Sequence, residues 1–110
     1  MTTMLKKLIL IAVVIVFSAG LASAQTIRVG FAAEPYPPFT TPDASGYWTG
    51  WVVEIMWAIC EEAKLDCVIT PSAWDGIIPA LMSKKIDMII GSMSITAERL
   101  KSIDFSDKYY

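Results

Sequence analysis

Apolar and polar positions alternate along this chain in short segments of two different periods. Thr26 to Phe31 alternates with the period of a strand, and Cys67 to Thr70 and Ile86 to Gly91 are short apolar runs of strand length. Val52 to Lys64 instead has helical spacing, because its apolar residues fall at i, i+3, i+4 and i+7, namely Val53, Met56, Trp57 and Cys60. The pattern therefore predicts three strands and a helix between the first two.

Two further helices are expected in the second half of the chain. Trp74 to Lys84 is apolar enough for a helix, and Pro79 falls near its first turn, where proline is tolerated. Thr96 is a good N-cap for a short helix from Ala97 to about Ser102. Ile103 to Phe105 then begins another extended segment.

The expected order is strand, helix, strand, helix, strand, which indicates an α/β fold with a parallel sheet and covering helices. Ligands in such folds bind beyond the carboxyl ends of the strands. Three segments should meet there: the loop Ala32 to Gly50, which is rich in proline and glycine, the turn at Trp74, and Gly91 to Arg99. A long loop of this kind inside a compact domain is more often functional than idle.

The first 24 residues have the pattern of a secretory signal peptide. Lys6 and Lys7 precede the apolar run Leu8 to Phe17, and the small residues end at Ala22-Ser23-Ala24. We expect cleavage after Ala24 and a mature domain at residues 25–110, located in the periplasm. An uncleaved membrane anchor is the alternative, although the apolar run is short for a membrane span of about 20 residues.

Charge and composition exclude several classes of function for residues 25–110. Seven basic residues face eleven acidic ones, which argues against a nucleic-acid partner. The length allows one domain with a modest core. The chain has no His, no glycine-rich phosphate loop and no recognisable catalytic motif, so catalysis has little support, and we expect no cofactor.

Cys60 and Cys67 are the two cysteines, and both follow the signal segment. In an oxidising exported compartment they can form a disulfide between the first helix and the second strand. Two buried free thiols are the alternative. A structural zinc site is disfavoured because zinc needs four ligands.

Gly91-Ser92-Met93-Ser94-Ile95-Thr96 leaves a buried strand and enters a helix. Gly91 permits close approach of a ligand to the backbone, Ser92 and Ser94 offer hydroxyls, and the helix start offers free N–H groups. Arg99 lies in the first turn and can bind a carboxylate through two parallel hydrogen bonds. These residues predict a site for a small carboxylate, and ordinary capping with a solvated Arg99 is the alternative.

Aromatic residues in the other two loops can form the walls of a pocket. Tyr36 lies in the proline-rich loop and Trp74 in the turn before the second helix, where each can stack on a ligand. Glu34 can pair with a cationic ligand group, or it can be solvated. Packing onto the domain is the alternative for both aromatic residues, and it is the expected role of three other aromatic residues, Trp48, Trp51 and Trp57.

The segment IPALMSKKIDMIIGSMSITAER, followed by FSDKYY, resembles the family 3 extracellular solute-binding proteins, which are polar amino-acid receptors of ABC importers. The resemblance runs from about Ile27 to Tyr110. It implies the fold of one lobe of a periplasmic binding protein. The spacing of Cys60 and Cys67 also resembles that of basic amino-acid receptors in the family, where the equivalent pair is bridged.

The resemblance implies a role for each matching residue. Arg99 matches the arginine that binds the α-carboxylate of the ligand, and Ser94 matches a position that helps to hold it. Gly91 and Ser92 match the turn that contacts the α-ammonium group. Tyr36 and Trp74 match the aromatic pair that flanks the ligand side chain.

Three departures from the family pattern affect what the resemblance implies. Val52 stands where the family often has the first acid of Gly-Phe-Asp-x-Asp, and Glu54 keeps the second. The loop around Glu34 is one residue longer than in basic amino-acid receptors, so its match to their side-chain-reading acid is open. The family has two lobes, and residues 25–110 correspond to the first, so the second lobe is expected to be missing here.

The resemblance implies a monomeric, non-enzymatic binding protein that captures a free amino acid and presents it to a permease in the inner membrane. A sensor input domain of a membrane receptor is one alternative. An enzyme on the same fold, such as a periplasmic dehydratase, is another. The acidic charge balance and Glu34 favour a cationic amino acid, and polar neutral ligands fit as well.

Overall fold

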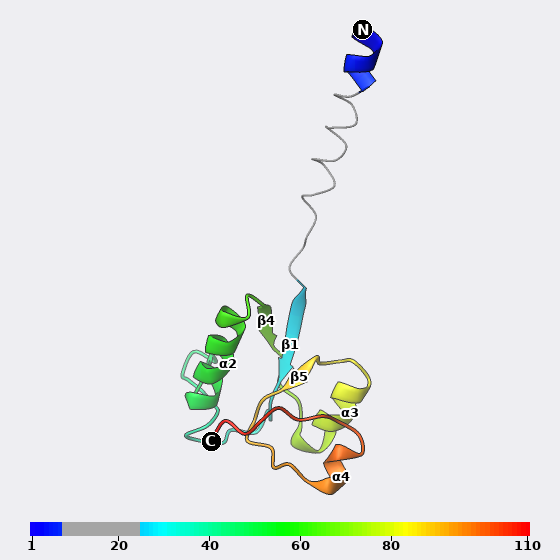
Figure 1. The fold of residues 1–110 in the computed structure, drawn as a ribbon. Coiled ribbons are helices and arrows are strands. Elements are labelled where there is room, and N and C mark those ends of the chain that lie inside the picture. The colour runs from blue at the N-terminus through cyan, green and yellow to red at the C-terminus, as the bar shows by residue number, and fades with distance from the viewer. Residues whose placement is uncertain (8–24) are drawn as a thin grey trace.

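The computed structural model describes residues 1–7 and 25–110, and the signal-peptide prediction with its cleavage site at Ala24 falls largely outside them. From residue 25 onward the chain forms an α/β unit (Figure 1). Its elements in order are β1 (Thr26–Gly30), β2 (Thr41–Pro42), β3 (Trp48–Thr49), α2 (Trp51–Glu62), β4 (Asp66–Ile69), the 3₁₀ turn η1 (Trp74–Gly76), α3 (Ile77–Met82), β5 (Met88–Ile89) and α4 (Ala97–Leu100).

The main sheet has three parallel strands in the order β4-β1-β5, which confirms the predicted fold class. Val29 in β1 pairs with Ile69 in β4 on one side and with Met88 in β5 on the other. The chain therefore moves from the central strand to one side of the sheet and then crosses to the other side. In this topology ligands bind where the connections diverge, beyond the carboxyl ends of the strands.

Helix α2 covers one face of the sheet and forms most of the core there (Figure 1). Its buried residues are Val52, Val53, Met56 and Cys60, and they pack with Val29, Phe31 and Ile90 from the strand side. The predicted face was wrong at Trp57, whose side chain is 45% exposed. Val52 takes the inward position, so the residue that replaces the family's acid is part of the core.

The opposite face of the sheet carries α3 (Figure 1). Ile77 and Ile86 are buried on this side, and Gly30 of β1 leaves room for Ile86, because a Cβ at Gly30 would meet its Cδ1. The helix predicted at Trp74 to Lys84 is shorter and begins with a 3₁₀ turn. Lys84 has a positive φ of 61° and ends the helical segment early.

The loop from Ala32 to Gly50 contains two short strands, although its many proline and glycine residues predicted an irregular loop. Strands β2 and β3 form a small antiparallel hairpin, in which Asp43 accepts hydrogen bonds from the backbone N–H groups of Ser45 and Tyr47 at 2.8 and 3.0 Å. Gly46 adopts a positive φ of 84° in the turn. The residues that predicted an irregular loop therefore make the hairpin turn.

Helix α2 begins without a side-chain cap. Its first N–H groups, from Trp51 and Val52, donate to the carbonyl oxygens of Pro38 and Phe39 at 3.3 and 3.2 Å. Gly50 precedes the helix with φ of 118°, and a Cβ there would collide with the carbonyl oxygen of Phe39. The proline-rich loop and the helix start are thus fastened to each other through the backbone.

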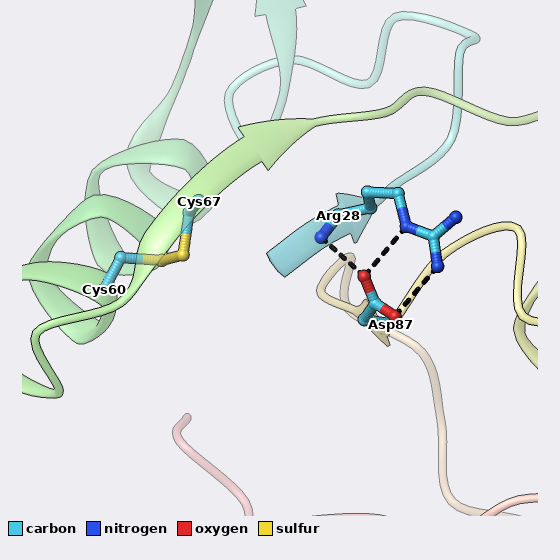
Figure 2. Close-up of a disulfide and its surroundings, with 4 residues drawn as sticks. All are labelled: Arg28, Cys60, Cys67 and Asp87. Carbon is cyan, nitrogen blue, oxygen red and sulfur yellow. Dashed lines mark hydrogen bonds and ion pairs between the residues drawn. A yellow bond between two sulfur atoms is a disulfide. The ribbon is translucent and has the colours of Figure 1, made fainter. Parts of the chain in front are cut away.

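Cys60 and Cys67 form a disulfide that ties the last turns of α2 to the start of β4 (Figure 2). Their Cα atoms are 6.2 Å apart. The predicted disulfide is therefore confirmed, and the alternative of two free thiols is excluded.

An ion pair joins β1 to the residue before β5 at the same end of the sheet (Figure 2). The Asp87 carboxylate accepts hydrogen bonds from the Arg28 backbone N–H at 2.8 Å and from Nε and Nη2 at 2.9 and 3.0 Å. Arg28 Nη2 also donates to the Lys84 carbonyl at 2.7 Å. The side-chain hydrogen bonds from Arg28, followed by its backbone hydrogen bond, lower the pKa of Asp87 to about 2.

The chain after α4 returns across the molecule toward the start of α2 (Figure 1). Among the described residues, Ile103 to Phe105 form no strand in either sheet. Tyr109 and Tyr110 pack their rings against Trp51, with centroids 6.3 and 5.0 Å from it. This aromatic packing holds the returning segment against the helix start.

Candidate functional site

The three segments expected to converge do meet beyond the carboxyl ends of the strands. A cavity of about 440 Å³ opens there, which is within the size range of small-molecule sites. Residues from the loop after β1, from η1 and from the segment after β5 all line it: Phe31, Ala32, Glu34, Pro35, Tyr36, Phe39, Thr40, Trp74, Gly91 and Ser92.

Four of the six predicted ligand-binding residues are in this lining, namely Tyr36, Trp74, Gly91 and Ser92. Tyr36 stacks on Phe39 with ring centroids 5.0 Å apart, and its side chain remains largely exposed. Trp74 is contributed by η1, the turn that precedes α3. The loop after β1 and the turn η1 therefore both contribute aromatic rings to the walls of the cavity, which suits a ligand with a flat or cationic side chain.

Glu34 is held at the cavity by the segment after β4. Its Oε2 accepts a hydrogen bond from the Trp74 backbone N–H at 3.3 Å. Next to it, the Ala33 N–H donates to the Ser72 carbonyl at 2.9 Å, and Ala32 forms a parallel bridge with Ser72. These bonds extend the β1–β4 pairing beyond the sheet and place a carboxylate beside the aromatic walls.

Arg99 is not among the residues that line the cavity. Thr96 caps α4 as predicted, with its hydroxyl accepting from the Arg99 N–H at 3.2 Å. The Arg99 guanidinium carbon lies 5.8 Å from the Trp74 ring centroid, and Nη1 donates to the Ser94 carbonyl at 2.7 Å. Trp74 is therefore both a lining residue of the cavity and a neighbour of the Arg99 guanidinium.

Helix α4 is shorter than expected, since it spans Ala97–Leu100 and does not reach Ser102. A single turn has a weak macrodipole, so the attraction for an anion depends mainly on the charge of Arg99. The remaining nitrogens of its guanidinium, Nε and Nη2, have no partner among the described residues. They are geometrically suited to a carboxylate.

Ser94 lies in a neighbouring hollow of about 330 Å³, and Ser92 lines both hollows. Ser92 has a positive φ of 56°, a conformation that costs free energy for a residue other than glycine. Its Oγ is buried and has no hydrogen-bond partner among the described residues. Strain and an unsatisfied hydroxyl at one position are typical of functional sites.

The sequence analysis did not single out five lining residues of the cavity: Phe31, Ala32, Pro35, Phe39 and Thr40. Phe31 ends the alternating segment that contains β1, and such alternation predicts a strand without marking a site residue. Its ring packs edge-on against Trp48 at 4.8 Å. Phe39 and Thr40 follow Pro37-Pro38 in the loop, and no periodic pattern marks such positions.

The described residues contain neither a cluster of metal ligands nor a helix that could span a membrane. Residues 1–7 and 25–110 hold no group of three or more His, Cys, Asp or Glu side chains that could bind a metal ion. Within the same ranges, no helix has both the length and the apolar character needed to cross a membrane.

The topology and the cavity together define an α/β lobe with a hollow beyond the carboxyl ends of its parallel strands. A family model for bacterial extracellular solute-binding proteins, family 3, matches residues 27–110. The chain therefore belongs to this family, which confirms the resemblance seen in the sequence.

Curated relatives include receptors for basic amino acids. The chain is 45% identical over 89 residues to the L-arginine-binding protein of Pseudomonas aeruginosa, covering 81% of this chain and 34% of that protein. It is 39% identical over 93 residues to the lysine/arginine/ornithine-binding periplasmic protein of Escherichia coli, covering 84% of this chain and 35% of that protein. The chain thus spans about a third of the length of these relatives.

Solved structures of similar proteins have the same fold. An ancestral arginine-binding protein bound to arginine matches with a TM-score of 0.74 and 44% identity, covering 77% of this chain and 37% of that one. The arginine-bound form of domain 1 from TmArgBP matches with 0.71 and 39%, covering 77% and 67%. An ancestral cyclohexadienyl dehydratase matches with 0.71 and 27%, covering 84% and 42%.

Proposed function

We propose that this chain is the ligand-binding part of a periplasmic receptor that captures a free basic amino acid, with L-arginine as the first candidate, for an ABC importer. The observation that carries the proposal is the cavity with aromatic walls between Glu34 and the Arg99–Trp74 pair. A basic amino acid has a carboxylate at one end and a cation at the other. Glu34 in the lining offers a negative charge for the cation, and Arg99, next to the lining residue Trp74, offers a positive charge for the carboxylate. The names of the curated relatives agree with this ligand class.

In the proposed complex, Arg99 binds the α-carboxylate, and Ser94 helps to hold it. Gly91 and Ser92 contact the α-ammonium group through backbone and hydroxyl oxygens. Tyr36 and Trp74 flank the side chain of the ligand. The hydrogen bond from the Trp74 N–H orients the Glu34 carboxylate, which then faces the cationic end of the ligand.

A single lobe is proposed to be sufficient for measurable binding. The arginine-bound form of domain 1 from TmArgBP is a solved structure of which this chain covers 67%, so binding to one domain has a precedent among the neighbours. A second lobe would enclose the ligand further and exclude water, which strengthens charge-assisted contacts. The affinity of residues 25–110 alone should therefore be lower than that of a two-lobed receptor.

Export and delivery are part of the same proposal. Residues 1–24 would direct the chain to the periplasm and be removed after Ala24, and the mature protein would act as a monomer that presents its ligand to a permease. We propose binding without turnover, since the curated relatives compared above are named as binding proteins. The dehydratase among the solved neighbours makes recovery of unchanged L-arginine a necessary control.

The test is isothermal calorimetry of L-arginine binding to the purified chain and to Arg99→Ala. Losing the charge-assisted contact to the carboxylate should weaken binding by about 2–5 kcal/mol. Lys101→Ala is the matched control, because Lys101 is an exposed cation next to the same helix whose partner is Glu98. Undiminished affinity of Arg99→Ala would contradict the assignment, and equal binding of L-glutamine would contradict the preference for a cation.

A further inference from the structure

The segment that returns across the molecule touches the cavity lining at one polar contact. The backbone N–H of Ser92 donates to the Tyr109 hydroxyl at 3.3 Å, and the two residues are 17 positions apart. Ser92 lines the cavity, whereas Tyr109 does not. Tyr109 thus reaches the site through Ser92, from the side of the neighbouring hollow that both residues line.

The Ser92 backbone is a position where such a contact has consequences. With φ of 56° the residue is in the left-handed region, which a serine adopts only when its surroundings hold it there. Apart from the Tyr109 hydroxyl, the Ser92 N–H has no acceptor among the described residues. The orientation of this peptide group decides where the Ser92 hydroxyl and carbonyl lie relative to the cavity.

The ring of Tyr109 is itself well supported. It packs against Trp51 at 6.3 Å and against Tyr110 at 5.3 Å, both in edge-on arrangements. Tyr110 in turn stacks on Phe39 at 6.4 Å, and Phe39 stacks on Tyr36 in the cavity wall. A hydroxyl carried on such a packed ring is a fixed hydrogen-bond partner, because aromatic pairs restrict the motion of the ring.

We propose that Tyr109 is a positioning residue for the ligand cavity: its hydroxyl holds the left-handed Ser92 so that the Ser92 hydroxyl and carbonyl face the bound amino acid. The inference rests on the proposed function, since it concerns the same site. Tyr109 acts through Ser92 and makes no contact with the ligand. Affinity at this site therefore depends on a residue of the returning segment.

The experiment compares Tyr109→Phe with the unmodified chain and with Tyr47→Phe. Tyr109→Phe removes the hydroxyl and keeps the ring that packs on Trp51. Tyr47→Phe removes the same group from a side chain that is 74% exposed and whose hydroxyl has no partner among the described residues. The readouts are the Kd for L-arginine by calorimetry, the thermal midpoint, and the amide resonance and hydrogen exchange of Ser92 by NMR without ligand.

The expected result is a loss of affinity of about three- to tenfold for Tyr109→Phe, the usual effect of one hydrogen bond, and no change for Tyr47→Phe. The Ser92 amide should shift and exchange faster in Tyr109→Phe before any ligand is added, while amides of β1 stay unchanged. A lower thermal midpoint alone, with unchanged Kd and an unchanged Ser92 amide, would reduce Tyr109 to a packing residue and overturn the proposal.

The two readouts separate this inference from the proposed function. If the unmodified chain binds L-arginine and Tyr109→Phe binds it equally well, the positioning role fails and the proposed function stands. If the unmodified chain binds no amino acid, the proposed function fails and the effect on binding fails with it. The Ser92 amide of the ligand-free protein still decides whether Tyr109 holds Ser92.

Discussion

The two ends of the parallel sheet differ in whether their polar and reactive groups have partners within the chain. At the amino end, charged and reactive groups find their partners within the chain: Arg28 with Asp87, and Cys60 with Cys67 (Figure 2). At the carboxyl end, the Ser92 hydroxyl has no partner among the described residues and its backbone is strained. Both ends are built on the same central strand, β1, only five residues long.

The difference indicates a division of labour along the sheet. Partners within the chain stabilise the fold at one end, while at the other end the buried Ser92 hydroxyl lacks a partner among the described residues, at a cost in free energy. Local departures from well-satisfied structure are expected where a protein binds its ligand. If this interpretation is correct, changes at the amino end should affect stability alone, and changes at the carboxyl end should affect binding first.

The Cys60–Cys67 disulfide provides the strongest test at the amino end. Replacing both cysteines by serine should lower the free energy of unfolding by about 2 kcal/mol, because the bridge closes a short loop in the unfolded chain. The Kd for L-arginine, measured well below the unfolding transition, should not change. Urea unfolding and calorimetry on the same samples check both statements, and a weakened Kd in fully folded protein would contradict the division.

Ser92→Ala should have the reverse effect at the carboxyl end. The Ser92 hydroxyl is buried without a hydrogen-bond partner among the described residues, which costs free energy in the folded state. Removing it should therefore raise the free energy of unfolding by about 1 kcal/mol. The same change should weaken arginine binding severalfold. Ser83→Ala is the control, since its hydroxyl donates to the Ala80 carbonyl and its removal should bring no gain. A loss of stability in Ser92→Ala would contradict this account.

The smallest effect is expected from the Arg28–Asp87 pair, and it depends on pH. The pKa of Asp87 in the folded protein is lowered from its ordinary 3.8 to about 2, so ionised Asp87 favours the folded state above pH 4. This contribution is lost as the pH falls from about 4 to about 2. The stability difference between the unmodified chain and Asp87→Asn, measured by urea unfolding, should therefore shrink over that range. Ser83→Ala, which removes no ionisable group, should show no such trend.

Much of the fold was predictable because its periodic signals are local. The strand at Thr26 to Phe31, the helix beginning near Val52 and the Thr96 cap were each readable from a few neighbouring residues, and the structure has all three. Errors arose where tertiary contacts decide. Trp57 has the spacing of a core residue, but its side chain is 45% exposed. The side of the helix that faces the sheet carries Val52 and Val53 instead.

The site was predictable in part for a related reason. In any parallel sheet, the residues that directly follow the strands lie at the same edge. The predicted strand positions therefore indicated Gly91 and Ser92 as site residues. Phe39 and Thr40 reach the cavity through a loop whose path depends on the backbone contacts with α2. The contact of Tyr109 with Ser92 joins residues whose spacing follows no period, and no sequence pattern marks it.

The sequence by itself determined the class of fold, the parallel arrangement of its strands and part of the cavity lining, including Gly91 and Ser92. It could do so because hydrophobic period and cap chemistry act over a few neighbouring residues. Only the tertiary structure decided that Cys60 and Cys67 are bridged, that Arg99 lies on Trp74 outside the cavity lining, and that Ser92 is left-handed against Tyr109. These features depend on distances between segments far apart in the chain, which packing sets and local pattern does not encode.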